Sequence, residues 1–149
     1  MSVGECCNRE VIVISEIKTV SEAAKLMREC HVGDLIVVQD REPSQKPVGI
    51  LTDRDIAIEI VAAGVDPEVV TVGDAMSYRL ATIDEGAEIT VAVELMRDRK
   101  VRRLPVVDKQ GMLVGILTSD DVIDLLAEQL VGLSRLFTLQ RWDEQEARS

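Results

Sequence analysis

The sequence predicts an α/β fold built from two copies of one β-α-β-β-α unit. Residues 2–38 align with residues 71–107 without a gap, and identical residues fall at both apolar and polar positions. After a loop that is three residues longer in the first copy, VGILTDRDI (48–56) aligns with VGILTSDDV (114–122). Such self-similarity indicates a repeated supersecondary unit. Because one copy is too small to bury its sheet on both sides, we expect the two copies to pack by a pseudo-twofold around a single core.

Each copy contains signals for the same elements in the same order. A serine or threonine followed three residues later by an acidic residue predicts a capped turn. The spacing of Ala23, Leu26 and Met27, which recurs in the second copy, gives a helix one apolar face. Two β-branched runs around a polar turn predict a strand pair. For the first and second copy, we expect the turn at 2–5 and 71–74, the first strand at 11–14 and 80–83, the helix at 21–30 and 90–99, the strand pair at 35–38 with 48–51 and at 104–107 with 113–117, and the second helix from Thr52 and Thr118.

The two copies differ most beyond the start of the second helix. In the first copy Gly64 is a natural helix stop, and a link containing Asp66-Pro67 comes after it. In the second copy apolar residues continue at a helical period and predict a helix to about Gln140 before a frayed acidic end. Such a helix either finds a partner, which favours a homodimer, or folds back on its own module. We therefore divide the chain into repeat 1 (2–64), a linker (65–70), repeat 2 (71–130) and a C-terminal helical extension with an acidic tail (131–149).

Composition argues against several classes of function. The 149 residues carry a formal net charge of −10, which disfavours binding to nucleic-acid phosphates, and the three aromatic residues offer no stacking platform for single strands. The apolar runs are shorter than the roughly 18 residues that suggest a membrane span, and the first residues lack a secretory signal. With 46% hydrophobic residues and three cysteines, the sequence predicts a cytoplasmic globular protein with reduced thiols and with neither a nucleic-acid nor a membrane partner.

These motifs resemble those of a tandem pair of CBS domains, the Bateman module. The matching segments are VGILTDRD (48–55) in the first copy, and LPVVD (104–108) with VGILTSDD (114–121) in the second. The resemblance covers about residues 2–130. The chain as a whole is similar to small stand-alone CBS-pair proteins of bacteria or archaea. Ile36 stands where the family pattern has proline, which bears on the equivalence of the two sites rather than on the fold. The resemblance implies a regulatory module that requires no cofactor and binds an adenosine-containing ligand: AMP, ADP, ATP, S-adenosylmethionine or NAD.

The Thr-x-x-Asp motif has two interpretations. Thr52 and Thr118 each stand where a strand meets a helix, and a helix N-terminus with a threonine hydroxyl suits a phosphate. Three residues on, Asp55 or Asp121 can accept hydrogen bonds from both hydroxyls of a ribose. The same spacing also makes a plain capping box, in which the aspartate accepts from the threonine amide. The two roles can coexist.

In CBS pairs the ligand clefts are crossed, so the resemblance implies that each Thr-x-x-Asp motif faces the other copy. Apolar residues of the first strand and of the mid-repeat loop would then hold the base, although any one of them, taken alone, is more typical of an ordinary core residue. Carried over by position, Thr118 and Asp121 face Ile12, Val32 and Gly33, while Thr52 and Asp55 face Ala81, Val101 and Arg102.

The charges predict that the two clefts differ. The mid-repeat loop reads KVRR (100–103) in the second copy and HVGD (31–34) in the first. A guanidinium such as that of Arg102 can bind phosphate oxygens in a bidentate way, unless it points into solvent. We therefore expect a charged adenine nucleotide to bind first at the cleft of Thr52, and the cleft of Thr118 to take a less charged ligand or none.

No residue pattern predicts catalysis or a metal centre. Adjacent Cys6 and Cys7 with a distant Cys30-His31 match no zinc-ligand spacing, so free thiols are the preferred interpretation. No nucleophile is paired with a base by the sequence, so we expect a protein that is not an enzyme. The main alternative to nucleotide sensing is a structural module whose clefts stay empty and whose surfaces serve dimerisation. In either case we expect a downstream protein target.

Overall fold

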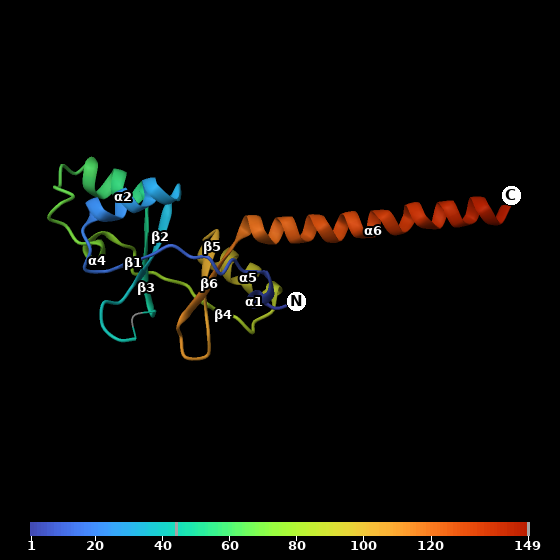
Figure 1. The fold of residues 1–149 in the computed structure, drawn as a ribbon, viewed down its shortest axis with the longest axis horizontal. Helices are drawn as coiled ribbons and strands as arrows, with labels where there is room; N and C mark the ends of the chain where they lie inside the picture. The colour runs from blue at the N-terminus through green and yellow to red at the C-terminus, as the bar shows by residue number, and fades with distance from the viewer. Residues whose placement is uncertain (44, 149) are drawn as a thin grey trace.

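The structure is a computed structural model and describes residues 1–43 and 45–148. Two small sheets lie side by side with helices packed on them, and one long helix leaves the second sheet (Figure 1). In chain order the elements are α1 (Val3–Cys6), β1 (Val13–Ser15), α2 (Val20–Cys30), β2 (Asp34–Val38), β3 (Pro47–Thr52), α3 (Asp53–Asp55), the π-helical segment η1 (Ile56–Val61), α4 (Val72–Ala75), β4 (Ile83–Asp84), α5 (Ile89–Arg99), β5 (Arg103–Val107), β6 (Leu113–Thr118) and α6 (Ser119–Arg148).

Both sheets have the same topology. β1 pairs parallel with β2, and β2 pairs antiparallel with β3; β4, β5 and β6 repeat this order. Leu35 lies opposite Leu51 in the first sheet, and Leu104 lies opposite Leu117 in the second. All four leucines are fully buried. The α/β fold class and the two packed repeats are thus confirmed.

The first short helix of each repeat packs on the sheet of the other repeat. Val3 of α1 is buried among residues of β4, β5 and β6, and its N–H donates to the carbonyl oxygen of Ala87 at 2.8 Å. Val72 of α4 is buried against the first sheet, and its N–H donates to the carbonyl oxygen of Lys18 at 2.7 Å. Each repeat thus packs its first helix on the other repeat, as the expected pseudo-twofold symmetry requires. It also produces two apolar clusters, one for each sheet, so the expectation of a single core was wrong.

Two glycines allow the chain to cross between the sheets. After α1, Asn8 forms a bridge to β6, and after α4, Ser77 forms a bridge to β3. A Cβ on Gly115 would lie 2.8 Å from the carbonyl oxygen of Asn8, and one on Gly49 would lie 2.8 Å from that of Ser77. Only glycine permits this approach without a backbone shift. The residues that follow α1 and α4 form this crossing and do not join the strands. For this reason β1 and β4 begin later than the sequence pattern indicates.

The main helices of the two repeats start differently and end alike. Thr19 Oγ1 accepts the Glu22 N–H at 3.1 Å, and the Glu22 carboxylate accepts the Thr19 N–H at 2.9 Å, which completes the expected capping box of α2. The bond from the Thr19 amide lowers the pKa of Glu22. In α5 the N-cap is Glu88, whose side chain makes no cap hydrogen bond. Both helices end at a residue in the left-handed conformation, His31 or Lys100.

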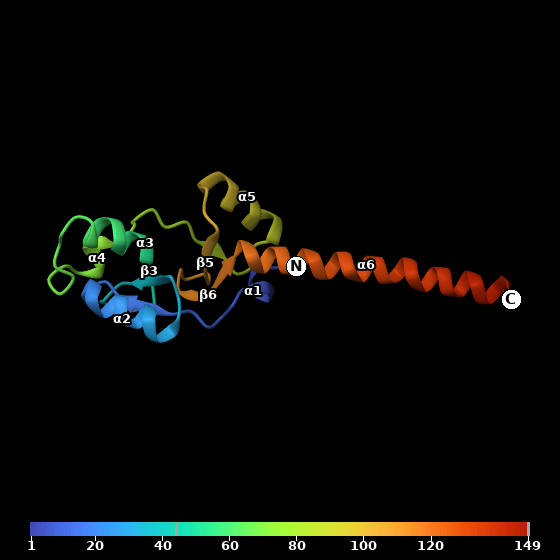
Figure 2. The same cartoon turned by 90° about the horizontal axis from the view of Figure 1, so that it is seen from above.

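The second helices start alike and end differently. α3 continues into η1, and the chain then turns at Gly64 with a φ of 70°. α6 runs without a break to Arg148, past its expected end near Gln140, because residues 141–148 include neither glycine nor proline. It projects away from both sheets and does not fold back on them (Figure 2). Although α6 is long, neither it nor any other helix among the described residues has the length and apolarity to cross a membrane.

Candidate functional site

Both Thr-x-x-Asp motifs form capping boxes at a strand–helix junction. The Asp55 N–H donates to Thr52 Oγ1 at 3.1 Å, and the Thr52 N–H donates to Asp55 Oδ2 at 3.0 Å. Thr118 and Asp121 make the same two bonds at the same distances. The capping interpretation is therefore confirmed at both sites. Because each box uses the Oδ2 oxygen, a ligand bond to Oδ1 does not require the box to open.

A cavity of about 240 Å³ lies between the two repeats beside Thr118. Ile12 and Val32 of the first repeat line it together with Thr118, which is the crossed arrangement that the resemblance implies. Asp121 is half-buried one turn into α6 and does not belong to the lining. The other lining residues are Asn8, Glu10, Val11, Asp34, Ile36, Arg103 and Ile116.

Two of the expected cleft residues lie beside the helix start of their own repeat. The Gly33 carbonyl oxygen accepts the Asp53 N–H at 2.9 Å, and the Arg102 carbonyl oxygen accepts the Ser119 N–H at 2.7 Å. These bonds satisfy one backbone amide at each helix N-terminus. The Arg102 residue is exposed. Neither residue lines the cavity beside Thr118, so their proposed ligand contacts stay predictions.

An ion pair between Asp34 and Arg103 lies in the cavity and joins the two repeats. The two residues occupy equivalent positions in the repeat alignment, and in their sheets they lie opposite Thr52 and Thr118. The pair therefore connects the neighbourhoods of the two Thr-x-x-Asp motifs. Since Arg103 compensates the charge of Asp34, this aspartate gives the Thr118 cleft no uncompensated negative charge with which to repel phosphate. The sequence analysis did not predict this ion pair. The signal that could have indicated it is the opposite charge of Asp34 and Arg103 at equivalent positions of the two repeats.

The apolar residues expected to clamp a base divide into two groups. Ala81 and Val101 pack against the apolar cluster of the second sheet, as ordinary core residues do. Ile12 and Val32 pack against the cluster of the first sheet and also line the cavity. The apolar residues expected at Thr118 thus line a cavity, whereas those expected at Thr52 belong to the apolar cluster of the second sheet.

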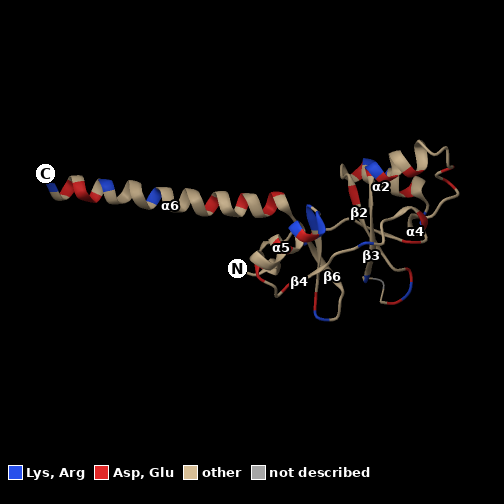
Figure 3. Ribbon diagram, turned by 180° about the vertical axis from the view of Figure 1, so that it is seen from behind, with Lys and Arg blue, Asp and Glu red and all other residues tan. Residues whose placement is uncertain are grey.

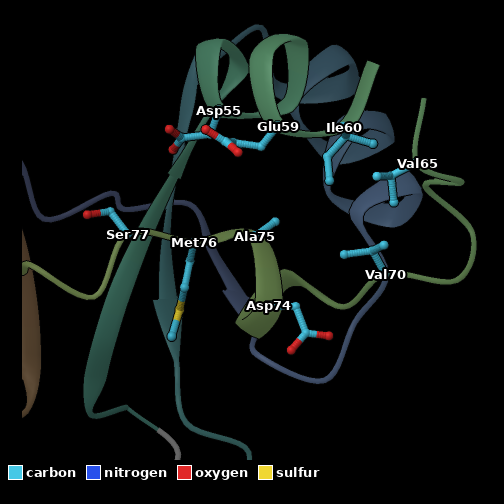
Figure 4. Close-up of a pocket in the computed structure, with 9 residues that line it drawn as sticks. All are labelled: Asp55, Glu59, Ile60, Val65, Val70, Asp74, Ala75, Met76 and Ser77. Atoms are coloured by element: carbon cyan, nitrogen blue, oxygen red, sulfur yellow. The ribbon is translucent and has the colours of Figure 1, made fainter. Parts of the chain in front are cut away.

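Asp55 lines a separate cavity of about 450 Å³. Figure 4 shows Asp55 and Glu59 extending from one helix, with Ser77 across from them. Ser77 follows α4 and belongs to the second repeat, so this cavity also lies where the repeats cross. Ile60, Val65 and Val70 supply apolar lining. The bridge from Ser77 to β3 places this serine here, and the motif spacing alone gave no reason to select it.

The three cysteines are free. Burial raises the pKa of both Cys6 and Cys7, which favours their protonated thiols. Cys30 is exposed at the end of α2. Within residues 1–43 and 45–148, no group of three or more His, Cys, Asp or Glu side chains is arranged to hold a metal ion.

Sequence comparison matches the CBS domain over residues 3–62 and 72–128. The chain belongs to the CBS domain family. This CBS pair is 40% identical to the protein MK0525 of Methanopyrus kandleri, over 84% of the chain and 62% of that relative. It is 36% identical to Hypoxic response protein 1 of Mycobacterium tuberculosis, over 83% of the chain and 84% of that relative.

Solved structures share the fold of this CBS pair. The crystal structure of Hypoxic Response Protein I with two coordinated zinc ions has a TM-score of 0.74 at 34% identity, covering 83% of this chain and 98% of that one. The CBS domain protein PAE2072 from Pyrobaculum aerophilum, complexed with AMP, has a TM-score of 0.72 at 27% identity, covering 81% and 89%. A CBS domain protein of this fold has thus been solved in complex with AMP.

Proposed function

We propose that this protein is a regulatory module that binds an adenine nucleotide in the cavity beside Thr118. One observation carries the proposal: apolar residues of the first repeat and the capped start of α6 in the second repeat line the same cavity. AMP in the PAE2072 complex supports the class of ligand.

The base is the part of the ligand that the cavity suits best. Ile12, Val32 and Ile116 offer apolar surface to a flat heteroaromatic ring. The volume of about 240 Å³ lies below the roughly 300 Å³ at which typical small-molecule pockets begin. The base would therefore be enclosed, while the ribose and phosphate extend toward the start of α6.

The sugar and the phosphate would meet polar groups at that helix start. A ribose can donate to Asp121 Oδ1 while Oδ2 keeps its bond to the Thr118 amide. Thr118 and the helix N-terminus favour a phosphate, whereas the one cation in the lining, Arg103, is already paired with Asp34. We expect AMP to bind here more tightly than ATP. S-adenosylmethionine and NAD contain the same adenosine and would use the same contacts.

Calorimetric titration with AMP tests the proposal. Asp121→Ala should weaken binding by about tenfold or more, equivalent to about 1.4 kcal/mol. Glu22→Ala is the matched control, because it removes a capping box of the same kind on α2, away from the cavity. Its AMP affinity should equal that of the wild type. Unchanged affinity in Asp121→Ala would rule out the ribose contact.

A second nucleotide site at Thr52 and Asp55, with Arg102 as phosphate ligand, stays a prediction of the resemblance. Adenosine, AMP, ADP and ATP titrated into wild type and Arg102→Ala give the test. The variant should lose more affinity as the ligand gains phosphates, and the loss should shrink at high salt. An equal loss for adenosine and ATP would show that Arg102 does not bind phosphate.

The alternative role, a structural module with empty clefts, has a different thermal signature. A ligand that binds only the folded state must raise the melting temperature. No shift with AMP, ADP, ATP, S-adenosylmethionine or NAD would favour the structural role over nucleotide sensing.

A further inference from the structure

The long helix α6 exposes an apolar face that no other described residue covers. Its start is anchored, since Val122 is buried in the cluster of the second sheet. Beyond that point Leu126, Leu130, Leu133 and Phe137 are 51%, 67%, 56% and 62% exposed. Figure 3 shows the helix largely free of charge through its middle. Soluble proteins rarely leave so continuous an apolar surface unpaired.

The spacing of these side chains is that of a helix–helix seam. Ile123, Leu126, Leu130, Leu133 and Phe137 succeed each other at alternating intervals of three and four residues. In a helix this pattern makes one narrow stripe, as the a and d positions of a coiled coil do. We use the name α6 stripe for these five residues. By the 3.6-residue period, Leu139 lies on the opposite side of the helix from Leu130.

We propose that the α6 stripe is a dimerisation surface whose occupant is the stripe of a second copy, packed antiparallel. The first support is self-complementarity. If a twofold axis between Val131 and Gly132 relates two antiparallel copies of α6, the centre of one stripe lies against the centre of the other. Leu130 then meets the partner's Leu133, and Leu126 meets the partner's Phe137. No residue of the α6 stripe lines the cavity beside Thr118, so the proposal does not rest on nucleotide binding.

Charge selects the antiparallel arrangement over the parallel one. The 3–4 spacing continues through Gln140 to Glu144, so a parallel pair would place Glu144 against Glu144 of the partner subunit in the seam. In the antiparallel pair, Arg141 approaches the acidic start of the other helix, where Asp120 lies on the same side of the seam.

The size of the surface suits a reversible dimer. The 30 residues of α6 extend about 45 Å, which leaves room for a second helix beside the exposed part. The α6 stripe offers five large apolar side chains, each at least half exposed, which is fewer than the roughly 20–30 residues that each partner gives to a standard interface. The dimer should therefore dissociate on dilution.

Sedimentation velocity of the full chain over a range of concentrations tests the surface. The wild type should be dimeric at high concentration. A double variant, Leu130→Gln with Leu133→Gln, should be monomeric there, because the seam loses its central layers. Leu139→Gln is the matched control, since Leu139 is 62% exposed on the other side of the helix. It should dimerise like the wild type. A wild type that is monomeric throughout, or equal behaviour of the two variants, would overturn the proposal.

A mixing experiment tests the antiparallel orientation. Leu126→Arg and Phe137→Glu chains each weaken their own dimers by placing a charge against an apolar residue. In an antiparallel pair of one chain of each kind, the new arginine meets the new glutamate and the other layer keeps its native leucine and phenylalanine. Native mass spectrometry of the mixture should therefore show the mixed dimer above its statistical share. A statistical distribution would overturn the antiparallel arrangement, because parallel packing brings neither pair together.

Discussion

The two repeats start their second helices with the same box and finish them in opposite ways. The Thr52 and Thr118 boxes have matching hydrogen bonds. The helical segment of the first repeat then ends at Val61, and a turn at Gly64 and then Pro67 follow it, whereas α6 continues to Arg148. In the repeat alignment Leu130 stands at the position of Gly64, and Leu133 stands at that of Pro67. The positions that stop one helix are thus the centre of the exposed stripe on the other.

The number of residues that determines where such a helix starts therefore differs from the number that determines where it ends. A helix start is local, because four residues supply both donors and both acceptors of the box. A helix end depends on the residues beyond it, and glycine alone is not enough, since α6 passes through Gly132 without a break. In the first repeat the positive φ of Gly64 and the rigid backbone before Pro67 act together.

The largest effect should come from the crossing that both repeats share. Gly49→Ala and Gly115→Ala each place a Cβ 2.8 Å from a backbone oxygen of the crossing chain. Overpacking of this kind costs about 1–3 kcal/mol of unfolding free energy. Gly132→Ala is the control, because an added Cβ there meets nothing within 4 Å and should stabilise the helix by up to about 1 kcal/mol. Urea unfolding of the three variants measures the difference, and equal stability would mean that the crossing tolerates a side chain.

The next effect should come from the helix stop that the repeats do not share. Gly64→Ala forces alanine into a left-handed conformation, which costs roughly 1–2 kcal/mol, and Pro67 still prevents continuation of the helix. Circular dichroism should show unchanged helix content in this variant and a gain only when Pro67→Ala is added. A gain with Gly64→Ala alone would make glycine the sole stop.

A smaller and equal effect is expected at the two shared boxes. Asp55→Ala and Asp121→Ala should each lower the unfolding free energy by about 0.5–2 kcal/mol, because each leaves one threonine amide without its acceptor. Denaturant melts give the stabilities. A much larger loss at Asp121 than at Asp55 would show that the long α6 depends on its cap in a way that the short first helix does not.

Local features were predictable from the sequence and non-local ones were not. The boxes at Thr19, Thr52 and Thr118 result from spacings within four residues, and the strand pairs result from β-branched runs around a turn. The exchange of α1 and α4 depends on contacts between residues some 50–85 positions apart, such as Val3 with Ala87 and Val72 with Lys18. No periodicity within one repeat encodes such contacts. The resemblance placed Ile12 and Val32 beside Thr118 because it carried that non-local information from other sequences.

The smallest effect concerns the main helices of the two repeats, α2 and α5. Only the cap of α2 should make a contribution to the unfolding free energy that changes with pH. Glu22 completes the box of α2, whereas its equivalent in α5 is Val91 and the N-cap there makes no side-chain bond. The Thr19 amide holds the pKa of Glu22 below its ordinary value in the folded protein. A lowered folded-state pKa stabilises the fold above the unfolded-state pKa, and this contribution disappears as pH falls through the folded-state value. The difference in unfolding free energy between wild type and Glu22→Gln should therefore be constant near neutral pH and decline in acid. Because Glu22 is exposed, the change should be small, and a difference that stays constant down to strongly acidic pH would exclude an ionic contribution to this cap.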